Sequence, residues 1–241
     1  MNIYTINKIG ELLKDNTYPG RGIINGKSAD GKKAVFAYFI MGRSDNSRNR
    51  VFIKTEDGIM IKPYDESKVE DPSLIIYYPV RRYEDKVIVT NGDQTDTIYE
   101  HLQKGKCFGC ALKTREFEPD GPNFTPRISS MLTVGDKFEY KMSILKSADE
   151  KGSACNRYTY SYEPLNGLGH FIHTYVCDGN PIPTFQGEPE RVEIPNCIDA
   201  FTQEIWNNLN EQNKISLYVE YIDLESGKVE YKLINKFGKG E

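Results

Sequence analysis

The segment Ala34-Val35-Phe36-Ala37-Tyr38-Phe39-Ile40-Met41 is the longest apolar run of the chain. It is far shorter than the roughly 20 residues that a membrane-spanning helix needs. Its aromatic and β-branched residues instead favour a buried strand. A strand-like run at 22–26 precedes it, and the connection Ser28-Ala29-Asp30-Gly31 is typical of a hairpin turn. The sequence therefore predicts an antiparallel pair near the start of the chain.

Further strand-like runs form two blocks, with helix-like segments between and after them. The predicted strands lie at 22–26, 34–41, 51–55, 58–63, 74–81 and 87–90, and then at 128–134, 137–144, 155–163, 169–177, 217–223 and 228–235. The predicted helices lie at 3–16, 96–103, 107–117 and 196–210. Runs of strands with segregated helices indicate an α+β protein rather than an alternating α/β one. Two antiparallel sheets, packed face to face and covered by helices, would use this inventory.

The composition excludes several classes of protein. The chain has 241 residues, with 31 Lys and Arg against 35 Asp and Glu, so its formal net charge is −4. A protein that grips a nucleic acid across a broad face usually carries a basic excess. No Pro-, Gly- or Ser-rich linker divides the chain, so we expect one domain over 1–241. The N-terminus does not resemble a signal peptide, and the five cysteines are expected to be reduced, as in a soluble cytoplasmic protein.

The connection at 41–50, directly after the apolar strand, is the densest cluster of polar side chains. It carries Arg43, Arg48 and Arg50, with no acidic run nearby to pair them. The planar guanidinium matches phosphate or carboxylate oxygens bidentately, so this connection is a candidate anion site. A solvated hairpin loop is the alternative. Arg21 lies in a similar segment, where flanking glycines let a ligand approach the backbone, with a plain turn as the alternative.

Two further connections carry groups that bind anions or titrate. At 90–97, between a predicted strand and helix, Asp93 or Thr95 is a candidate N-cap, and the free amides of the first helical turn form an anion site. Simple capping is the alternative. The run at 116–120 places three acids within five residues, and neighbouring carboxylates raise one another's pKa, as a general acid or base needs. A solvated helix end is the alternative. Arg127 then opens the next predicted strand.

Motifs for metal or redox chemistry are sparse. Cys107-Phe108-Gly109-Cys110 is a CxxC motif, but no second pair or His partner with zinc-like spacing accompanies it, and it lacks a βαβ context. His170 and His173 have odd spacing on one predicted strand, so they face opposite sides and cannot ligate one ion. No Walker, GxGxxG or GxSxG motif occurs.

Four segments, in this order and spacing, resemble the archaeal-type IMP cyclohydrolase family. They are Tyr18-Pro19-Gly20-Arg21, Gly42-Arg43-Ser44 through Asn49-Arg50, Thr90-Asn91-Gly92 through Thr95-Asp96-Thr97-Ile98, and Thr125-Pro126-Arg127-Ile128. The resemblance covers 18–130 closely and the remainder more loosely, and 1–17 looks like an N-terminal helical extension. It implies a four-layer αββα sandwich of two packed antiparallel sheets, similar to the N-terminal nucleophile (Ntn) hydrolase fold but without its autoprocessed nucleophile.

The resemblance also implies an activity. The family is a hydrolase-class cyclohydrolase that closes 5-formamidoimidazole-4-carboxamide ribotide to IMP with loss of water, in the last step of de novo purine biosynthesis. This chemistry requires no metal and no organic cofactor. The expected partner is a small-molecule purine ribonucleotide, not a nucleic-acid polymer or a membrane, and a protein of this fold often forms a homo-oligomer. A paralogue that binds a related nucleotide as a non-catalytic sensor, or acts on a related ribotide, is the alternative.

The roles of individual residues follow from the same resemblance. It implies that Arg50 neutralises the developing oxyanion, that Tyr77 donates a hydrogen bond or relays a proton, and that Glu118 is the general acid or base. Tyr78 is the alternative to Tyr77, because adjacent residues of a strand point to opposite faces and only one can serve. The expected substrate-binding residues are Arg21, Arg43, Ser44, Asn91, Gly92, Thr95 and Arg127.

Overall fold

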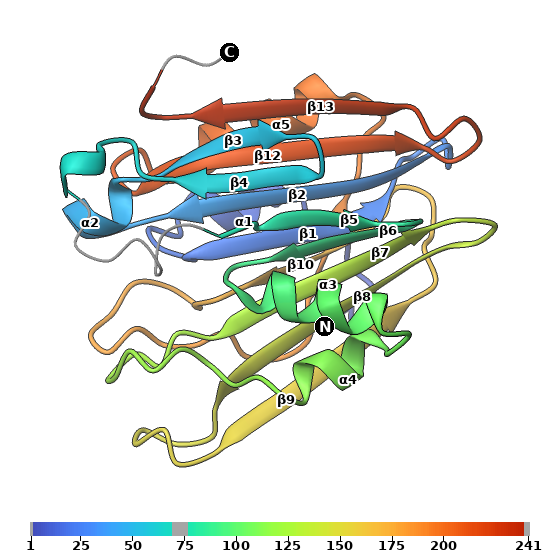
Figure 1. The fold of residues 1–241 in the computed structure, drawn as a ribbon. Helices are drawn as coiled ribbons and strands as arrows, with labels where there is room; N and C mark the ends of the chain where they lie inside the picture. The colour runs from blue at the N-terminus through green and yellow to red at the C-terminus, as the bar shows by residue number, and fades with distance from the viewer. Residues whose placement is uncertain (1, 69–76, 239–241) are drawn as a thin grey trace.

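Two antiparallel sheets form the centre of the computed structural model, which describes residues 2–68 and 77–238 (Figure 1). Sheet A has the strand order β11-β10-β1-β2-β12-β13, and sheet B has the order β3-β4-β5-β6-β7-β8-β9. The strands of sheet A are β1 (Arg21–Lys27), β2 (Lys33–Met41), β10 (Leu168–His173), β11 (Glu190–Glu193), β12 (Lys214–Asp223) and β13 (Val229–Asn235). Those of sheet B are β3 (Val51–Thr55), β4 (Gly58–Lys62), β5 (Val80–Tyr83), β6 (Lys86–Thr90), β7 (Arg127–Val134), β8 (Phe138–Ser147) and β9 (Cys155–Tyr162).

Strand β2 explains why its sequence is apolar without interruption. Phe36, Tyr38 and Ile40 point into the core between the two sheets. Val35 and Phe39 point the other way, into a second core beneath helices. Because side chains alternate across a strand, a strand covered on both faces needs apolar residues at every position.

Helices cover the outer face of each sheet, which makes four layers. Helices α1 (Ile9–Leu13) and α5 (Ile198–Asn208) pack on sheet A, whereas α3 (Gln94–Gln103) and α4 (Phe108–Leu112) pack on sheet B (Figure 1). The connections hold two short helical turns, α2 (Asp45–Arg48) and η1 (Glu66–Lys68). This arrangement confirms the predicted α+β class and the two packed antiparallel sheets. None of the described helices is long and apolar enough to cross a membrane.

Several predicted boundaries were wrong. The helix predicted over 3–16 is only Ile9–Leu13, because Ile3 and Ile6 are exposed and Asn7 instead pairs with Val192 of β11. The helix predicted over 107–117 ends at Leu112, because the chain then turns and the Thr114 hydroxyl bonds to the Ala111 carbonyl.

Two strand predictions also need correction. The short polar strand β11 was not predicted at all, since its sequence has little apolar alternation. Of the strand predicted over 74–81, residues 74–76 lie outside the described part, and the strand found there is Val80–Tyr83.

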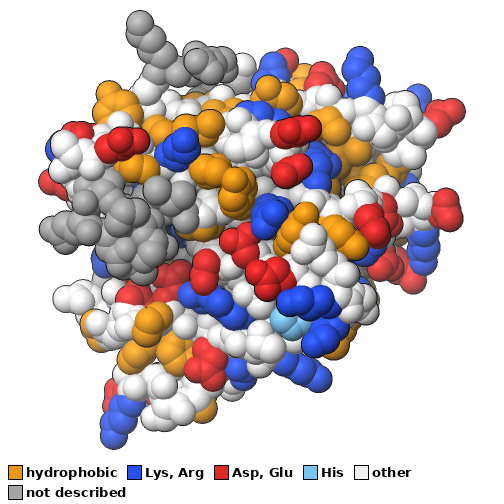
Figure 2. Space-filling view, viewed as in Figure 1, with side chains coloured by type: hydrophobic (Ala, Val, Ile, Leu, Met, Phe, Trp, Pro, Cys, Tyr) orange, Lys and Arg blue, Asp and Glu red, His pale blue; other side chains and the backbone are white. Residues whose placement is uncertain are grey.

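Basic and acidic side chains are interspersed on the face drawn in Figure 2. This mixture agrees with the near balance of charges in the sequence. A surface that grips a nucleic-acid polymer would instead carry a continuous basic field.

Candidate active site

The strand register brings the predicted site residues to one edge of the sandwich. Arg21, at the start of β1, pairs with Ile40 at the end of β2, so it lies beside the connection that carries Arg43 and Arg50. Thr90, at the end of β6, pairs with Ser129 near the start of β7. In an antiparallel sheet the start of one strand is next to the end of its neighbour. Residues far apart in the sequence therefore meet here.

Two adjoining hollows at this edge form what we call the arginine cavity. The larger part, about 540 Å³, is lined by Tyr18, Arg21, Arg43, Ser44, Asn46, Ser47, Arg50, Glu118, Pro119, Asp120, Asn123, Thr125, Tyr175 and Ile182. The smaller part, about 360 Å³, is lined by Arg21, Arg50, Tyr77, Asn91, Gly92, Asp93, Glu118, Pro119 and Arg127. Arg21, Arg50 and Glu118 line both parts, so they mark the junction between them. All the predicted site residues except Thr95 line the cavity.

Arg21 and Arg50 are the strongest sign that this cavity binds an anion. The Nε atom of each is buried and has no hydrogen-bond partner among the residues that the structure describes. Burial and the charge of Arg21 lower the pKa of Arg50. Burial also acts to lower the pKa of Arg21, but three tyrosines and Glu118 raise it above its ordinary value. A buried donor without a partner is costly, so an anionic ligand placed here would relieve both guanidinium groups.

Glu118 supplies the titratable group at the junction. Its backbone amide donates to the Thr125 carbonyl at 2.9 Å, which holds the residue against the start of β7. Burial, and to a lesser degree Asp120, raises the pKa of the Glu118 carboxyl, although Arg21, Arg127 and Arg50 oppose the shift. A carboxyl with a raised pKa is a stronger base than an ordinary glutamate and can exchange a proton nearer neutral pH.

Tyr77 faces the smaller part of the cavity, whereas Tyr78 does not line it. The Tyr77 hydroxyl donates to the Asn91 carbonyl at 2.9 Å and lies 3.4 Å from the Tyr38 hydroxyl. Burial raises the pKa of Tyr77 despite the nearby Arg50 and Arg21. Tyr77 is thus neutral and able to donate a hydrogen bond. Tyr78 lies under the guanidinium of Arg81 instead, with 5.2 Å from Cζ to the ring centroid.

Arg127 is held in place by an acidic neighbour. Its Nη1 atom donates to Asp93 Oδ1 at 2.6 Å and to Gln94 Oε1 at 2.7 Å. Asp93 also accepts from Arg115 Nη2 at 2.5 Å, and the two arginines lower its pKa against the effect of burial. A Cβ atom at Gly92 would lie 2.6 Å from Arg127 Nη1, so glycine leaves room for this guanidinium.

Asn91 and Thr95 hold the loop after β6. The Asn91 amide donates to the Pro126 carbonyl at 2.8 Å and accepts from the Ile128 amide at 2.9 Å and from Gln94 Nε2 at 3.0 Å. The Thr95 hydroxyl is buried, 2.6 Å from the Thr90 hydroxyl and 3.1 Å from the Gly92 carbonyl. Their side chains are thereby committed to the protein, and Thr95 lies beneath the cavity wall.

The three arginines of the connection after β2 point in different directions. Ser44 caps α2, and its hydroxyl accepts from the Ser47 amide, which forms a capping box. This turn directs Arg48 away from the cavity. Its guanidinium donates instead to the Gly42 carbonyl at 3.1 Å and to Asn213 Oδ1 at 3.1 Å. Arg43 lies at the exposed rim, paired with Asp178 at 2.5 Å and 5.2 Å from the centroid of the Tyr18 ring.

The sequence analysis missed much of the cavity wall. Tyr175 follows β10 and stacks on Tyr18 with 5.8 Å between ring centroids. Its hydroxyl lies 2.6 Å from that of Thr125, and the Thr125 amide and hydroxyl both donate to Asp120. Burial raises the pKa of Tyr175 to about 12. Only the pairing of β10 with β1 brings Tyr175 to this edge, and no local motif indicates that pairing.

Metal ligands do not gather in this region. Over residues 2–68 and 77–238, no group of three or more His, Cys, Asp or Glu is placed to hold a metal ion. Guanidinium, phenol and carboxyl groups instead supply positive charge, a hydrogen-bond donor and a proton acceptor. These groups suit a reaction in which an anionic substrate is held and protons are moved.

Comparisons with known proteins point in one direction. A family model described as IMP cyclohydrolase-like protein matches residues 18–227. A Methanococcus aeolicus protein named IMP cyclohydrolase is 28% identical over 205 residues, covering 77% of this chain and 95% of that protein. Its counterpart from Methanopyrus kandleri is 26% identical over 182 residues, covering 70% and 89%. The one from Methanocaldococcus jannaschii is 29% identical over 177 residues, covering 71% and 81%.

Proposed function

The chain belongs to the IMP cyclohydrolase-like family, and from this premise we propose that it closes 5-formamidoimidazole-4-carboxamide ribotide to IMP with loss of water. The family resemblance expected from the four sequence motifs is confirmed. The observation that carries the proposed reaction is the pair of buried Nε atoms of Arg21 and Arg50 beside Glu118, which have no partner within residues 2–68 and 77–238.

The reaction joins a poor nucleophile to a poor electrophile. The carboxamide nitrogen of the substrate attacks its formyl carbon, and the formyl oxygen gains negative charge before it leaves as water. An enzyme accelerates such a step by holding the two groups together, stabilising the oxyanion and moving protons.

Three side chains of the smaller part of the cavity match these tasks. Arg50 would stabilise the developing oxyanion with its fixed positive charge. Tyr77, kept neutral by its raised pKa, would turn its hydroxyl proton from the Asn91 carbonyl to the same oxygen. Glu118 would take a proton from the carboxamide nitrogen and pass it to the departing oxygen, and the formamide N–H supplies the second proton of the water as the ring C=N bond forms.

The larger part of the cavity suits the ribose phosphate. Arg43 and the Ser44–Ser47 turn line this part, and Arg21 stands at its junction with the smaller part. Charge-assisted hydrogen bonds from guanidinium groups to a phosphate contribute roughly 1.5–3 kcal/mol each. The substrate would therefore lie across the junction, with its imidazole near Glu118 and its phosphate toward Arg43.

The test is an ultraviolet assay of IMP formation from the formyl ribotide, with the Glu118→Gln protein as the matched control. We expect turnover by the parent protein and strongly reduced turnover by the control. Binding of the ribotide by the parent without any turnover would overturn the proposed reaction. That result would favour a nucleotide-binding sensor instead.

We place this reaction in the cytoplasm, where purine nucleotides are made. The expected homo-oligomer remains a prediction, and sedimentation analysis of the full chain would test it. The proposed roles of Arg50, Tyr77 and Glu118 do not depend on either point, since all three come from one chain.

A further inference from the structure

The CxxC motif lies outside the arginine cavity and has no place in the proposed reaction. Cys107 precedes α4 and Cys110 lies within its first turn, with both side chains exposed. Their Sγ atoms are 2.8 Å apart. A disulfide bond is about 2.05 Å long, so a small side-chain movement would join them.

Helix α4 presents the two thiols on a fixed support. Phe108, Ala111 and Leu112 are buried and pack against Ile98 and Leu102 of α3. Between the two cysteines, Gly109 has open space on its outer side, since a Cβ atom there would meet nothing within 4 Å. A reagent can therefore approach the pair from solvent while the helix stays packed.

The two sulfur atoms are not equivalent. The Cys110 backbone amide donates to Cys107 Sγ at 3.2 Å. The contacts of Cys107 Sγ with the Cys110 side chain and backbone amide lower the pKa of Cys107. A thiolate attacks disulfides far better than a thiol, so Cys107 is the nucleophile and Cys110 is the second, resolving thiol.

The other cysteines lack this arrangement. Cys177 and Cys197 are exposed, and neither has a sulfur partner within the described part of the chain. Burial raises the pKa of the Cys155 thiol, which makes it less reactive. The region around Cys107 also offers no third metal ligand among the described residues, so a dithiol fits better than a metal site.

We propose that Cys107 and Cys110 form a redox-active dithiol that exchanges with low-molecular-weight disulfides. The Cys107 thiolate attacks one sulfur of RS–SR, forms a mixed disulfide and releases one RS⁻, which takes a proton from water. Cys110 loses its proton and attacks Cys107 Sγ, which releases the second RS⁻. The protein dithiol loses two electrons and two protons, and RS–SR becomes two RSH. This inference is independent of the proposed cyclohydrolase activity.

The first experiment equilibrates the full chain in buffers with a range of reduced to oxidised glutathione ratios. Acid quenching, alkylation and peptide mass spectrometry then count the free thiols at each position. We expect Cys107 and Cys110 to become protected together, as one two-electron unit with no retained glutathione. Separate glutathionylation of Cys107 and Cys110, to the same extent as Cys177 and Cys197, would overturn the proposal.

Single-cysteine variants test the assigned roles. Cys110→Ser should trap glutathione on Cys107, because the resolving thiol is gone. Cys107→Ser should react at Cys110 about tenfold more slowly, because the variant loses the sulfur that accepts from the Cys110 backbone amide. Cys197→Ser is the matched control and should leave the Cys107–Cys110 titration unchanged. Equal reaction rates for Cys107→Ser and Cys110→Ser would contradict the assignment of Cys107 as nucleophile.

Discussion

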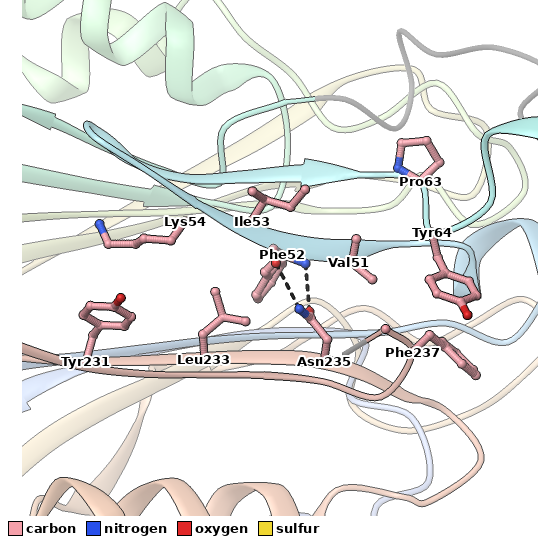
Figure 3. A pocket seen from close by; sticks show the side chains of 11 residues that line it. Val51, Phe52, Ile53, Lys54, Pro63, Tyr64, Tyr231, Leu233, Asn235 and Phe237 are labelled. Atoms are coloured by element: carbon pink, nitrogen blue, oxygen red, sulfur yellow. Dashed lines mark hydrogen bonds between the residues drawn. The ribbon is translucent and has the colours of Figure 1, made fainter. Parts of the chain in front are cut away.

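Two hollows of this molecule are built in opposite ways. One is the arginine cavity, whose two parts measure about 540 Å³ and 360 Å³. The other, which we call the edge groove, measures about 420 Å³ and runs between the edge strands β3 and β13 (Figure 3). It is lined by Val51, Phe52, Ile53, Lys54, Pro63, Tyr64, Tyr231, Leu233, Asn235, Phe237 and Gly238.

The edge groove satisfies its polar groups from within. The Asn235 amide accepts from the Phe52 backbone amide at 2.8 Å and donates to the Phe52 carbonyl at 3.0 Å, as the dashed lines in Figure 3 show. Its Oδ1 atom also accepts from the Ser216 hydroxyl at 2.6 Å. The Asn235 side chain thus pairs with a backbone amide and carbonyl as a neighbouring strand would, and it connects the edge of sheet B to sheet A.

The contrast separates a structural seam from the proposed binding site. The volume of the edge groove lies between those of the two parts of the arginine cavity, so the difference between the hollows is in their chemistry. In the arginine cavity, the buried Nε atoms of Arg21 and Arg50 have no partner in the part of the chain that the structure describes, and the pKa of Glu118 is raised. Such groups cost stability, and their cost is balanced only when a ligand engages them. The hydrogen bonds in the edge groove instead stabilise the folded protein.

The largest expected effect lies in the arginine cavity, at Glu118. Glu118→Gln keeps the shape and removes the titrating group, so we expect single-turnover ring closure to slow by roughly 10²–10⁴-fold, the usual contribution of a positioned acid or base. Ribotide binding, measured by calorimetry, should be largely kept. Ring closure by this variant at the parent rate would remove Glu118 from the mechanism.

Arg50→Lys should have the next largest effect. A lysine ammonium keeps the charge but loses the planar fork, so we expect kcat/KM to fall by the equivalent of about 1.5–3 kcal/mol. Arg48→Lys is the matched control, because Arg48 lies in the same connection but points toward Gly42 and Asn213. Equal losses in the two variants would show that the cavity does not distinguish these arginines.

The edge groove should respond in stability and not in rate. Asn235→Ala removes both bonds to the Phe52 backbone, so we expect unfolding in urea to cost about 1–2 kcal/mol less. Asn156→Ala, at an exposed position on the edge strand β9, is the control and should change little. A loss of kcat without a loss of stability in Asn235→Ala would break the distinction between the two hollows.

The smallest expected effect is the pH dependence of stability at Glu118. Its pKa is raised in the folded protein above the ordinary value of 4.5. The folded state therefore binds this proton more tightly, and the resulting stability is present below about pH 4 and lost as the pH rises through the raised pKa. The Tm of Glu118→Gln relative to the parent should therefore increase between about pH 4 and pH 8. Glu225→Gln, on an exposed turn, should show no such trend.

Local structure was the part of this molecule that the sequence could predict. The apolar run of β2, its hairpin with β1 and the closing hairpin of β12 and β13 all follow from alternation and turn residues. The four motifs likewise predicted which connections would meet. The strand and the two hairpins depend on neighbours in the sequence, whereas the meeting of the connections was predicted from the family resemblance.

The membership of the sheets could not be predicted in the same way. The two blocks of predicted strands do not correspond to the two sheets, since β1 and β2 join β10 to β13 in sheet A. Likewise, composition does not distinguish Arg48 from Arg50. Only the turn of α2 sends Arg48 toward Asn213 and leaves Arg50 in the cavity.

The strand order of sheet A has a consequence for synthesis on the ribosome. Sheet B is a meander whose strands pair in the order in which they are made, from β3 to β9. Strand β2 is made early, but its partner β12 is complete only when Asp223 has been added. At translation rates of roughly 5–20 residues per second, this delay is about 10–40 s. Throughout that interval the most apolar strand of the nascent chain has an unpaired edge, so it is the segment that a ribosome-associated chaperone should bind.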